Sequence, residues 1–175
     1  MIIVDNFVQD GVFLATLRDD RYWQTNTPYT WFDKNSLSES PWLKLTRQIW
    51  LFAARFHDLG TYEGYEMWTQ VIQDRELGWH VDKDEHKWRE TGEIINPILG
   101  SIYYAHSEHV EGGFLETRNK YGAQLVEPVP NRLVIHHPSQ DHMVHRCTAG
   151  VRRSFLTNLW EIKPSEQNFG SFAYS

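Results

Sequence analysis

From residue 64 onward the chain consists of short runs rich in β-branched and aromatic residues, and this feature constrains the fold most. The runs recur at about 8–12-residue spacing, separated by turn-forming sequences such as "NP", "EGG", "NKYG" and "HPSQD". They are "YEMWTQVI", "LGSIYYA", "GGFLET", "AQLVEP", "NRLVIHH", "HMVHRC" and "RSFLTNLWEI". This pattern is typical of a β-sandwich or jelly roll. It disfavours a βαβ nucleotide-binding fold, for which a Gly-rich phosphate loop is also missing.

The region before residue 64 has a helical pattern instead. Asp10 is a suitable N-cap for a helix over 11–20, and Ser40 followed by Pro41 starts a second helix that Gly60 ends. The second helix carries a stripe of core-facing residues at helical spacing: Trp42, Leu45, Ile49, Phe52 and Phe56. Helices packed on one sheet of a jelly roll give an α+β fold.

The length and composition fit one globular domain. Of the 175 residues, we expect 1–62 to be mainly helical support, 63–163 the β-barrel core and 164–175 a C-terminal tail. Hydrophobic content of 41% and charged content of 23% are ordinary for a folded protein, so disorder is not expected. The 8 Trp, 8 Tyr and 9 Phe predict a core or pocket with aromatic walls.

Charge and cysteine content narrow the partners and the compartment. A net charge of −6 without a long basic run argues against a nucleic-acid partner. Cys147 is the only cysteine, which favours a reducing, cytoplasmic location. The N-terminus lacks the pattern of a secretory signal, and no run approaches the roughly 18 apolar residues of a membrane span. The oligomeric state is not indicated.

The first candidate for chemistry is the triplet "HVD". His80 and Asp82 stand at i and i+2, so an extended strand places both side chains on one face, where they can bind one cation. Such a triplet also arises by chance, and the alternative is a surface pair with an ordinary hydrogen bond.

A second candidate segment lies about sixty residues downstream and offers four competing histidines: His136, His137, His142 and His145. A third ligand from this set would complete a two-histidine, one-carboxylate site with open coordination positions, as in non-haem Fe(II) oxygenases. A closed structural zinc site is disfavoured, because it is usually rich in thiolates and the chain has one cysteine.

The order of these motifs resembles that of the 2-oxoglutarate- and Fe(II)-dependent oxygenases, most closely the prolyl 4-hydroxylase-like branch. "HVD" is followed by "HMV" and then by "GVRRS", with ten residues from His142 to Arg152. "SIYYAHSEHVEGGFLET" resembles the family's "IYYLN…GG" segment, and "NRLVIHH" resembles the strand before the distal histidine. The resemblance covers roughly residues 65–160 and implies a double-stranded β-helix.

The resemblance also implies roles for individual residues. His80, Asp82 and His142 would bind Fe(II), because only His142 has both the His-x-Val context and the spacing to arginine. Arg152 would hold the distal carboxylate of 2-oxoglutarate, since its planar, permanently charged fork suits a carboxylate. For Arg152 the alternative is a surface salt bridge.

Two further residues would contact the cosubstrate. Tyr104 corresponds to a tyrosine that shares this carboxylate in related animal enzymes, while Tyr103 faces the opposite way. Gln70 stands where those enzymes have a second tyrosine, and this departure weakens the transfer of detail to that position.

The other candidates receive structural or peripheral roles. We expect His136 and His137 to be hydrogen-bonded structural residues, His145 to lie at the pocket rim or in the scaffold, and Trp79 to pack in the core. Asp84, Glu85 and His86 belong to a loop after the first ligands, with a solvated or a substrate-facing role.

The activity implied is hydroxylation of an unactivated C–H bond with O₂ and 2-oxoglutarate as cosubstrates and release of succinate and CO₂. The branch suggests a prolyl or other residue of a peptide or protein as substrate. A free amino acid or small metabolite is the alternative, and specificity is expected in the loop from residue 80 and in the C-terminal tail. The rival functions are a non-enzymatic cupin-like metal-binding protein and a metal-dependent hydrolase or isomerase.

Overall fold

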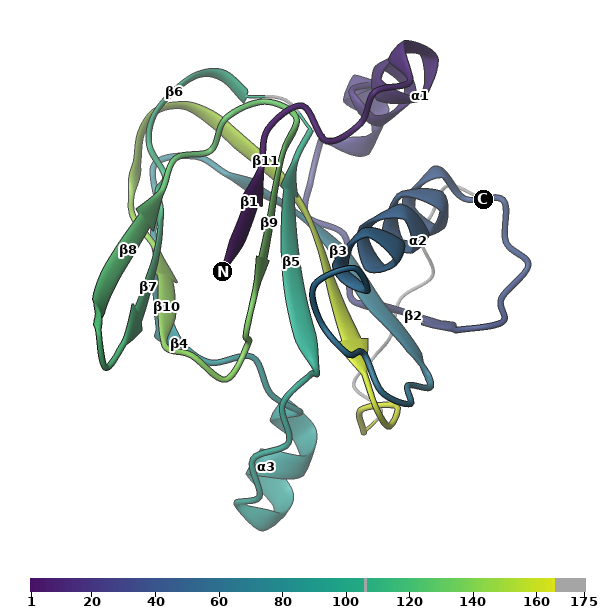
Figure 1. The fold of residues 1–175 in the computed structure, drawn as a ribbon. Helices are drawn as coiled ribbons and strands as arrows, with labels where there is room; N and C mark the ends of the chain where they lie inside the picture. The colour runs from purple at the N-terminus through teal and green to yellow at the C-terminus, as the bar shows by residue number, and fades with distance from the viewer. Residues whose placement is uncertain (106, 166–175) are drawn as a thin grey trace.

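The computed structural model describes residues 1–105 and 107–165, and two antiparallel sheets make up its barrel (Figure 1). The larger sheet has the order β1 (Ile2–Val4), β9 (Arg132–His136), β5 (Leu99–Tyr104), β11 (Cys147–Trp160), β3 (Gly64–Ile72) and β2 (Thr30–Asp33), with β6 (Ser107–Gly112) also paired to β11. The smaller sheet has the order β4 (Leu77–His80), β10 (His142–Val144), β7 (Leu115–Asn119) and β8 (Gly122–Val126). This arrangement confirms the predicted jelly roll.

The helices lie outside the barrel. They are α1 (Gly11–Leu17), a 3₁₀ turn (Asp20–Tyr22), α2 (Pro41–Ala53) and α3 (Glu85–Thr91). Asp10 caps α1 by accepting hydrogen bonds from two backbone N–H groups, as its position predicts. Helix α2 covers the outer face of the larger sheet, where Trp42 stacks on Phe155 with ring centroids 4.8 Å apart (Figure 1). The α+β class is therefore confirmed.

Successive side chains of the central strands point to opposite faces of the larger sheet and so belong to two separate hydrophobic cores. On β5, Tyr103 packs with the helices outside, whereas Tyr104 belongs to a cluster between the sheets. On β11, Phe155 likewise belongs to the outer core, and the neighbouring Leu156 packs against the inner cluster. The inner faces of these strands surround the cavity described below.

Three local expectations are wrong. The first third also contains strands. β1 pairs with β9 and β2 pairs with β3, so these two strands form the edges of the larger sheet. The second helix ends at Ala53 rather than near Gly60, and Phe56 in the following turns is 57% exposed rather than core-facing. The segment after Asp82 is not simply a loop, because Asp84 caps α3 through the N–H of Lys87.

In the part of the chain described, no helix combines the length and the apolar character that a membrane crossing requires. Residues 166–175, most of the predicted tail, lie outside the described residues.

Candidate metal centre

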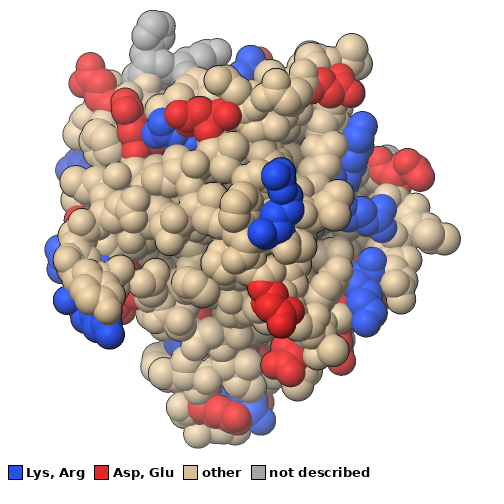
Figure 2. Space-filling view, viewed as in Figure 1, with Lys and Arg blue, Asp and Glu red and all other residues tan. Residues whose placement is uncertain are grey.

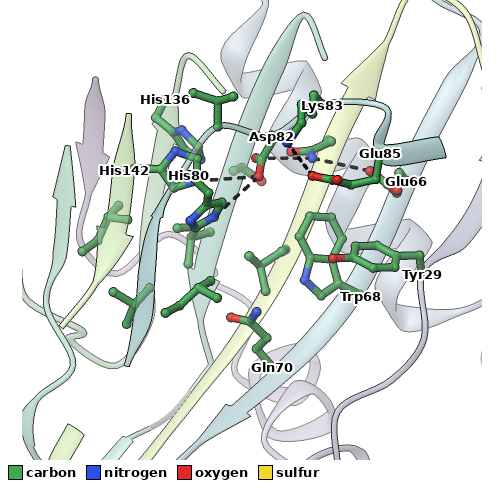
Figure 3. A pocket seen from close by; sticks show the side chains of 18 of the residues that line it. Tyr29, Glu66, Trp68, Gln70, His80, Asp82, Lys83, Glu85, His136 and His142 are labelled. Carbon is green, nitrogen blue, oxygen red and sulfur yellow. Dashed lines mark hydrogen bonds and ion pairs between the residues drawn. The ribbon is translucent and has the colours of Figure 1, made fainter. Parts of the chain in front are cut away.

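The three predicted ligands meet at one end of the smaller sheet (Figure 3). His80 ends β4 and His142 begins β10, and the two residues are paired across these antiparallel strands. Asp82 follows β4 by two residues. Its Oδ1 lies 3.6 Å from Nε2 of His142 and 3.9 Å from Nε2 of His80. One potential ligand atom from each residue lies within 4.8 Å of the others, which fits the donor set of a single cation.

Backbone carbonyls orient both imidazoles. Nδ1 of His80 lies 2.7 Å from the carbonyl oxygen of Gly78, and Nδ1 of His142 lies 2.9 Å from that of Gln140. An Nδ1–H donated to each carbonyl leaves both Nε2 lone pairs on the side of Asp82. This second hydrogen bond is the usual means by which proteins fix a metal-binding histidine.

The local charges favour an ionised Asp82. Burial by itself raises the pKa of Asp82, but the neighbouring imidazoles, first among them His142, outweigh it and hold the pKa below its ordinary value. Burial lowers the pKa of His80, and the nearby His142 lowers it further. Asp82 and His80 are thus held in the forms that bind a metal.

Asp82 is also fixed by neutral groups. Its backbone carbonyl accepts a hydrogen bond from the side-chain amide of Asn96 at 2.6 Å, and Oδ2 lies 3.5 Å from Nδ2 of Asn158. Gly100 makes room for this arrangement: a Cβ there would lie 2.9 Å from both Oδ1 of Asn158 and Nε2 of His136. Sequence reasoning missed Asn96, Asn158 and Gly100. The sequence does indicate Asn158: it stands an even number of residues after Arg152 on the same strand, so the two side chains lie on the same face.

Arg152 lies inside the barrel and is completely buried. Its guanidinium donates hydrogen bonds to the hydroxyls of Ser154 at 2.9 Å and Tyr104 at 3.3 Å, while its Nε has no partner in the described structure. No carboxylate within the described residues forms an ion pair with it. A buried cation without an anion is costly, so the site fits an anionic ligand. A surface salt bridge, the alternative for Arg152, is excluded by its burial.

The metal-site residues and Arg152 line one cavity of about 190 Å³. Gln70 also lines it, together with Glu66 and Trp68 at alternating positions of β3. Tyr29 completes this wall and contacts Trp68 with ring centroids 4.8 Å apart (Figure 3). The sequence analysis did not select Tyr29, Glu66 or Trp68, although the period-two pattern through Gln70 marks the latter two.

Glu66 is the unexpected charged group of this wall. It accepts a hydrogen bond from Nε1 of Trp160 at 3.1 Å and lies 3.5 Å from Nδ2 of Asn158, both through Oε2. Burial raises the pKa of Glu66 to about 7, and the negative charge of Asp82 contributes.

The remaining histidines lie outside the three-residue cluster. His136 is buried in the cavity wall with its ring 5.0 Å from that of His142, and burial together with His142 lowers its pKa to about 4. Its Nδ1 has no partner within the described residues, so the expected hydrogen bond is missing at this atom. His137 is exposed and contacts the ring of His57. Nε2 of His145 lies 2.7 Å from Glu116, away from the cluster, as a scaffold role predicts.

The side chains that flank the first two ligands in the sequence differ in exposure. Trp79 is not a core residue: it is 40% exposed and stacks against the guanidinium of Arg118 at 3.9 Å. His86 lies on α3, partly exposed, 3.4 Å from Glu90, which agrees with a solvated face. Glu85 lines the cavity but is paired with Lys83 at 2.6 Å.

Comparison with solved structures identifies the fold. A prolyl-4-hydroxylase from Pseudomonas putida aligns with a TM-score of 0.65 and 17% identity over 92% of each chain. HygX from Streptomyces hygroscopicus, solved with nickel and 2-oxoglutarate, aligns with a TM-score of 0.63 and 10% identity over 99% of this chain and 90% of its own. A Trichoplax adhaerens prolyl hydroxylase in complex with a hypoxia-inducible-factor peptide aligns with a TM-score of 0.60 and 13% identity, covering 91% and 83%.

No family model and no curated protein matches the sequence. At these identities the structural matches establish the fold. The chain has the double-stranded β-helix fold of 2-oxoglutarate- and Fe(II)-dependent oxygenases, as the sequence motifs predicted, and it places a His-Asp-His cluster inside it.

Proposed function

We propose that this protein is an Fe(II)- and 2-oxoglutarate-dependent oxygenase that hydroxylates an unactivated C–H bond of a prolyl or other residue in a peptide or protein. One observation carries the proposal: a two-histidine, one-carboxylate cluster and a buried arginine that has no anionic partner among the described residues line the same cavity. A free amino acid or small metabolite is the alternative substrate.

We assign the side chains of the cavity to two roles, binding of the metal and binding of the cosubstrate. Nε2 of His80, Nε2 of His142 and a carboxylate oxygen of Asp82 would hold the metal. Arg152, with the hydroxyl of Tyr104, would bind the distal carboxylate of 2-oxoglutarate, and Gln70 offers an amide to the same cosubstrate. When bound, the metal and 2-oxoglutarate supply O₂-dependent oxidation that releases succinate and CO₂. The protein supplies the geometry and a pocket that limits access of water.

A peptide substrate is supported by the two prolyl hydroxylases among the structural matches, one of which was solved with a peptide bound. A reducing, cytoplasmic setting suits the proposal because Fe(II) must remain reduced, and the single Cys147 is buried and free.

The rival functions do not explain why Arg152 is buried with no carboxylate partner among the described residues. A cupin-like metal-binding protein needs the barrel and the metal ligands but no buried guanidinium beside them. A hydrolase or isomerase with the same ligands would not depend on 2-oxoglutarate.

Anaerobic titration with Fe(II) and 2-oxoglutarate distinguishes these functions. The oxygenase should develop a weak visible charge-transfer band only when both are present. A protein that binds Fe(II) but shows no band and no 2-oxoglutarate binding by calorimetry would contradict the proposal.

A further inference from the structure

Glu66 is a partly buried carboxylate that the proposed oxygenase chemistry does not use. It lies on the inward face of β3 and lines the cavity (Figure 3). Its Oε2 contacts only neutral donors, Trp160 and Asn158, and within the described residues its Oε1 accepts no hydrogen bond. No lysine, arginine or histidine of the described chain lies within ion-pair distance of Glu66. The described residues therefore offer no positive charge to the carboxylate of Glu66 when it is ionised.

The other charged groups of the wall do not compensate for it. Lys83 is 2.6 Å from Glu85 and lies over the ring of Trp88 at 4.5 Å, so its charge is already engaged. Asp82 belongs to the metal cluster. Burial above all, and then the charges of Glu66, Asp82 and Glu85, raise the pKa of the Tyr29 hydroxyl to about 12. Two carboxylates, those of Glu66 and Asp82, thus line this part of the cavity, whereas Glu85 is paired with Lys83.

Aromatic faces border the same carboxylate. Trp68 stands two residues after Glu66 on the same face of β3, and Tyr29 contacts its ring. Ring faces attract cations, most strongly when water is excluded. Trp68 is only 7% exposed, and its Nε1 has no hydrogen-bond partner within the described residues. An unpaired indole N–H in the wall provides a donor for an acceptor atom of the same ligand.

We propose that Glu66, Tyr29 and Trp68 form a subsite for a cationic group of the substrate, an ammonium or guanidinium on an aliphatic chain. This inference rests on the proposed function, because it makes the wall next to the metal cluster the place where the substrate binds. A basic amino-acid residue has the required chemistry: its charge pairs with Glu66, its methylene chain lies against the aromatic rings, and a peptide carbonyl can accept from Trp68.

A pair of small probes tests the charge preference directly. n-Butylguanidinium and n-butylurea have nearly the same shape and differ in charge. Binding of each to the protein loaded with Zn(II) and 2-oxoglutarate, which cannot turn over, is measured by ligand-observed NMR and calorimetry. We expect the guanidinium to bind about tenfold more tightly, as for a charge-assisted hydrogen bond. Equal affinity of the two probes overturns the subsite.

Matched variants locate the effect. Glu66→Gln keeps the shape and hydrogen-bonding capacity toward Trp160 but removes the charge, and it should abolish the preference for the cation. Glu76→Gln removes the same charge from an exposed position between β3 and β4 and should preserve the preference. A preference that survives Glu66→Gln overturns the assignment. If Glu66→Gln does not fold, as judged by circular dichroism, the wild-type comparison still decides the proposal.

A peptide panel then separates this inference from the proposed function. Succinate release is compared for peptides that differ only by lysine against norleucine and by arginine against citrulline. Stimulation by the cationic members supports both proposals. Stimulation by the neutral members alone keeps the oxygenase and overturns the subsite. Absence of 2-oxoglutarate binding, with the guanidinium preference intact in the apoprotein, overturns the oxygenase and keeps the subsite.

Discussion

Two regions of the cavity carry groups of opposite charge that have no ion-pair partner in the described part of the chain, a basic end at Arg152 and an acidic wall at Glu66. Arg152 is completely buried and held by two hydroxyls, whereas Glu66 is partly exposed and held by an indole and an amide. The metal cluster lies beside the acidic wall, since Asn158 approaches both Glu66 and Asp82. Arg152 and Asn158 are about 20 Å apart along an extended strand.

This difference has a physical consequence for ligands. A buried charge without a partner costs free energy that a ligand of opposite charge recovers. The two regions therefore favour different ligands, an anion at the closed basic end and a cation at the acidic wall. One cavity can thus distinguish a cosubstrate from a substrate by charge.

The largest expected effect is a loss of activity when the metal cluster, which lies beside the acidic wall, loses a ligand. His142→Ala removes one of the three proposed ligands, so turnover of 2-oxoglutarate to succinate should fall to background. His145→Ala, three residues along the chain and hydrogen-bonded to Glu116, serves as the control and should retain most activity. Succinate release measures both variants. The reverse pattern would show that the wrong histidine has been assigned.

The next largest effect is a loss of 2-oxoglutarate affinity when the basic end is changed by itself. Arg152→Ala should weaken 2-oxoglutarate binding by about 100-fold, because a buried carboxylate would lose its charged partner. Metal affinity should change little. Arg153→Ala is the control, since the neighbouring residue points to the other face of β11. Calorimetry with 2-oxoglutarate measures the affinity, and an unchanged value in Arg152→Ala would remove the cosubstrate assignment.

A smaller effect is expected where the metal cluster meets the acidic wall. Gly100→Ala places a methyl group 2.9 Å from Asn158 and His136, which support the metal cluster, and should lower metal affinity by about tenfold. Gly11→Ala at the start of α1 is the control, because nothing lies within 4 Å of the added Cβ. Competition with a metal-binding dye measures both. Similar affinities in the two variants would show that Asn158 and His136 do not support the cluster.

The smallest effect concerns α3, which follows the first ligands. Asp84 is buried, caps this helix and accepts a hydrogen bond from the N–H of Ser165 at 2.6 Å. Asp84→Ala should lower the free energy of unfolding by about 1 kcal/mol, the usual cost of a lost cap. Urea denaturation measures it.

The same residue gives a pH dependence. Burial opposes ionisation of Asp84, but the backbone N–H groups outweigh it and hold its pKa below its ordinary value. Its contribution is therefore complete above the unfolded value and is lost as the pH falls through the lower folded value. The difference in unfolding free energy between wild type and Asp84→Ala should shrink in that acid range. A constant difference would contradict the cap as its cause.

Most of the strands follow from local patterns, and the proposed ligands follow from the resemblance of the motifs to those of the oxygenases. Short β-branched runs predicted the jelly roll, and period-two alternation placed His80 with Asp82 and Arg152 opposite in direction to Arg153. The positions of α3, of β6 and of the two short edge strands did not follow. An edge strand such as β1 forms because β9 offers it free backbone groups, and its own sequence of three residues carries too little pattern.

The amino-acid sequence by itself determined the fold class, because strand periodicity is a local property, and the resemblance of its motifs to those of the oxygenases implied the residues proposed to hold the metal and cosubstrate. Only the tertiary structure decided that Glu66, Trp68 and Tyr29 share a cavity with them and that no lysine, arginine or histidine within residues 1–105 and 107–165 pairs with Glu66. Alternation shows which residues lie on one face of a strand. Which charges on that face remain unpaired depends on side chains brought from distant strands, and this is a property of the folded protein.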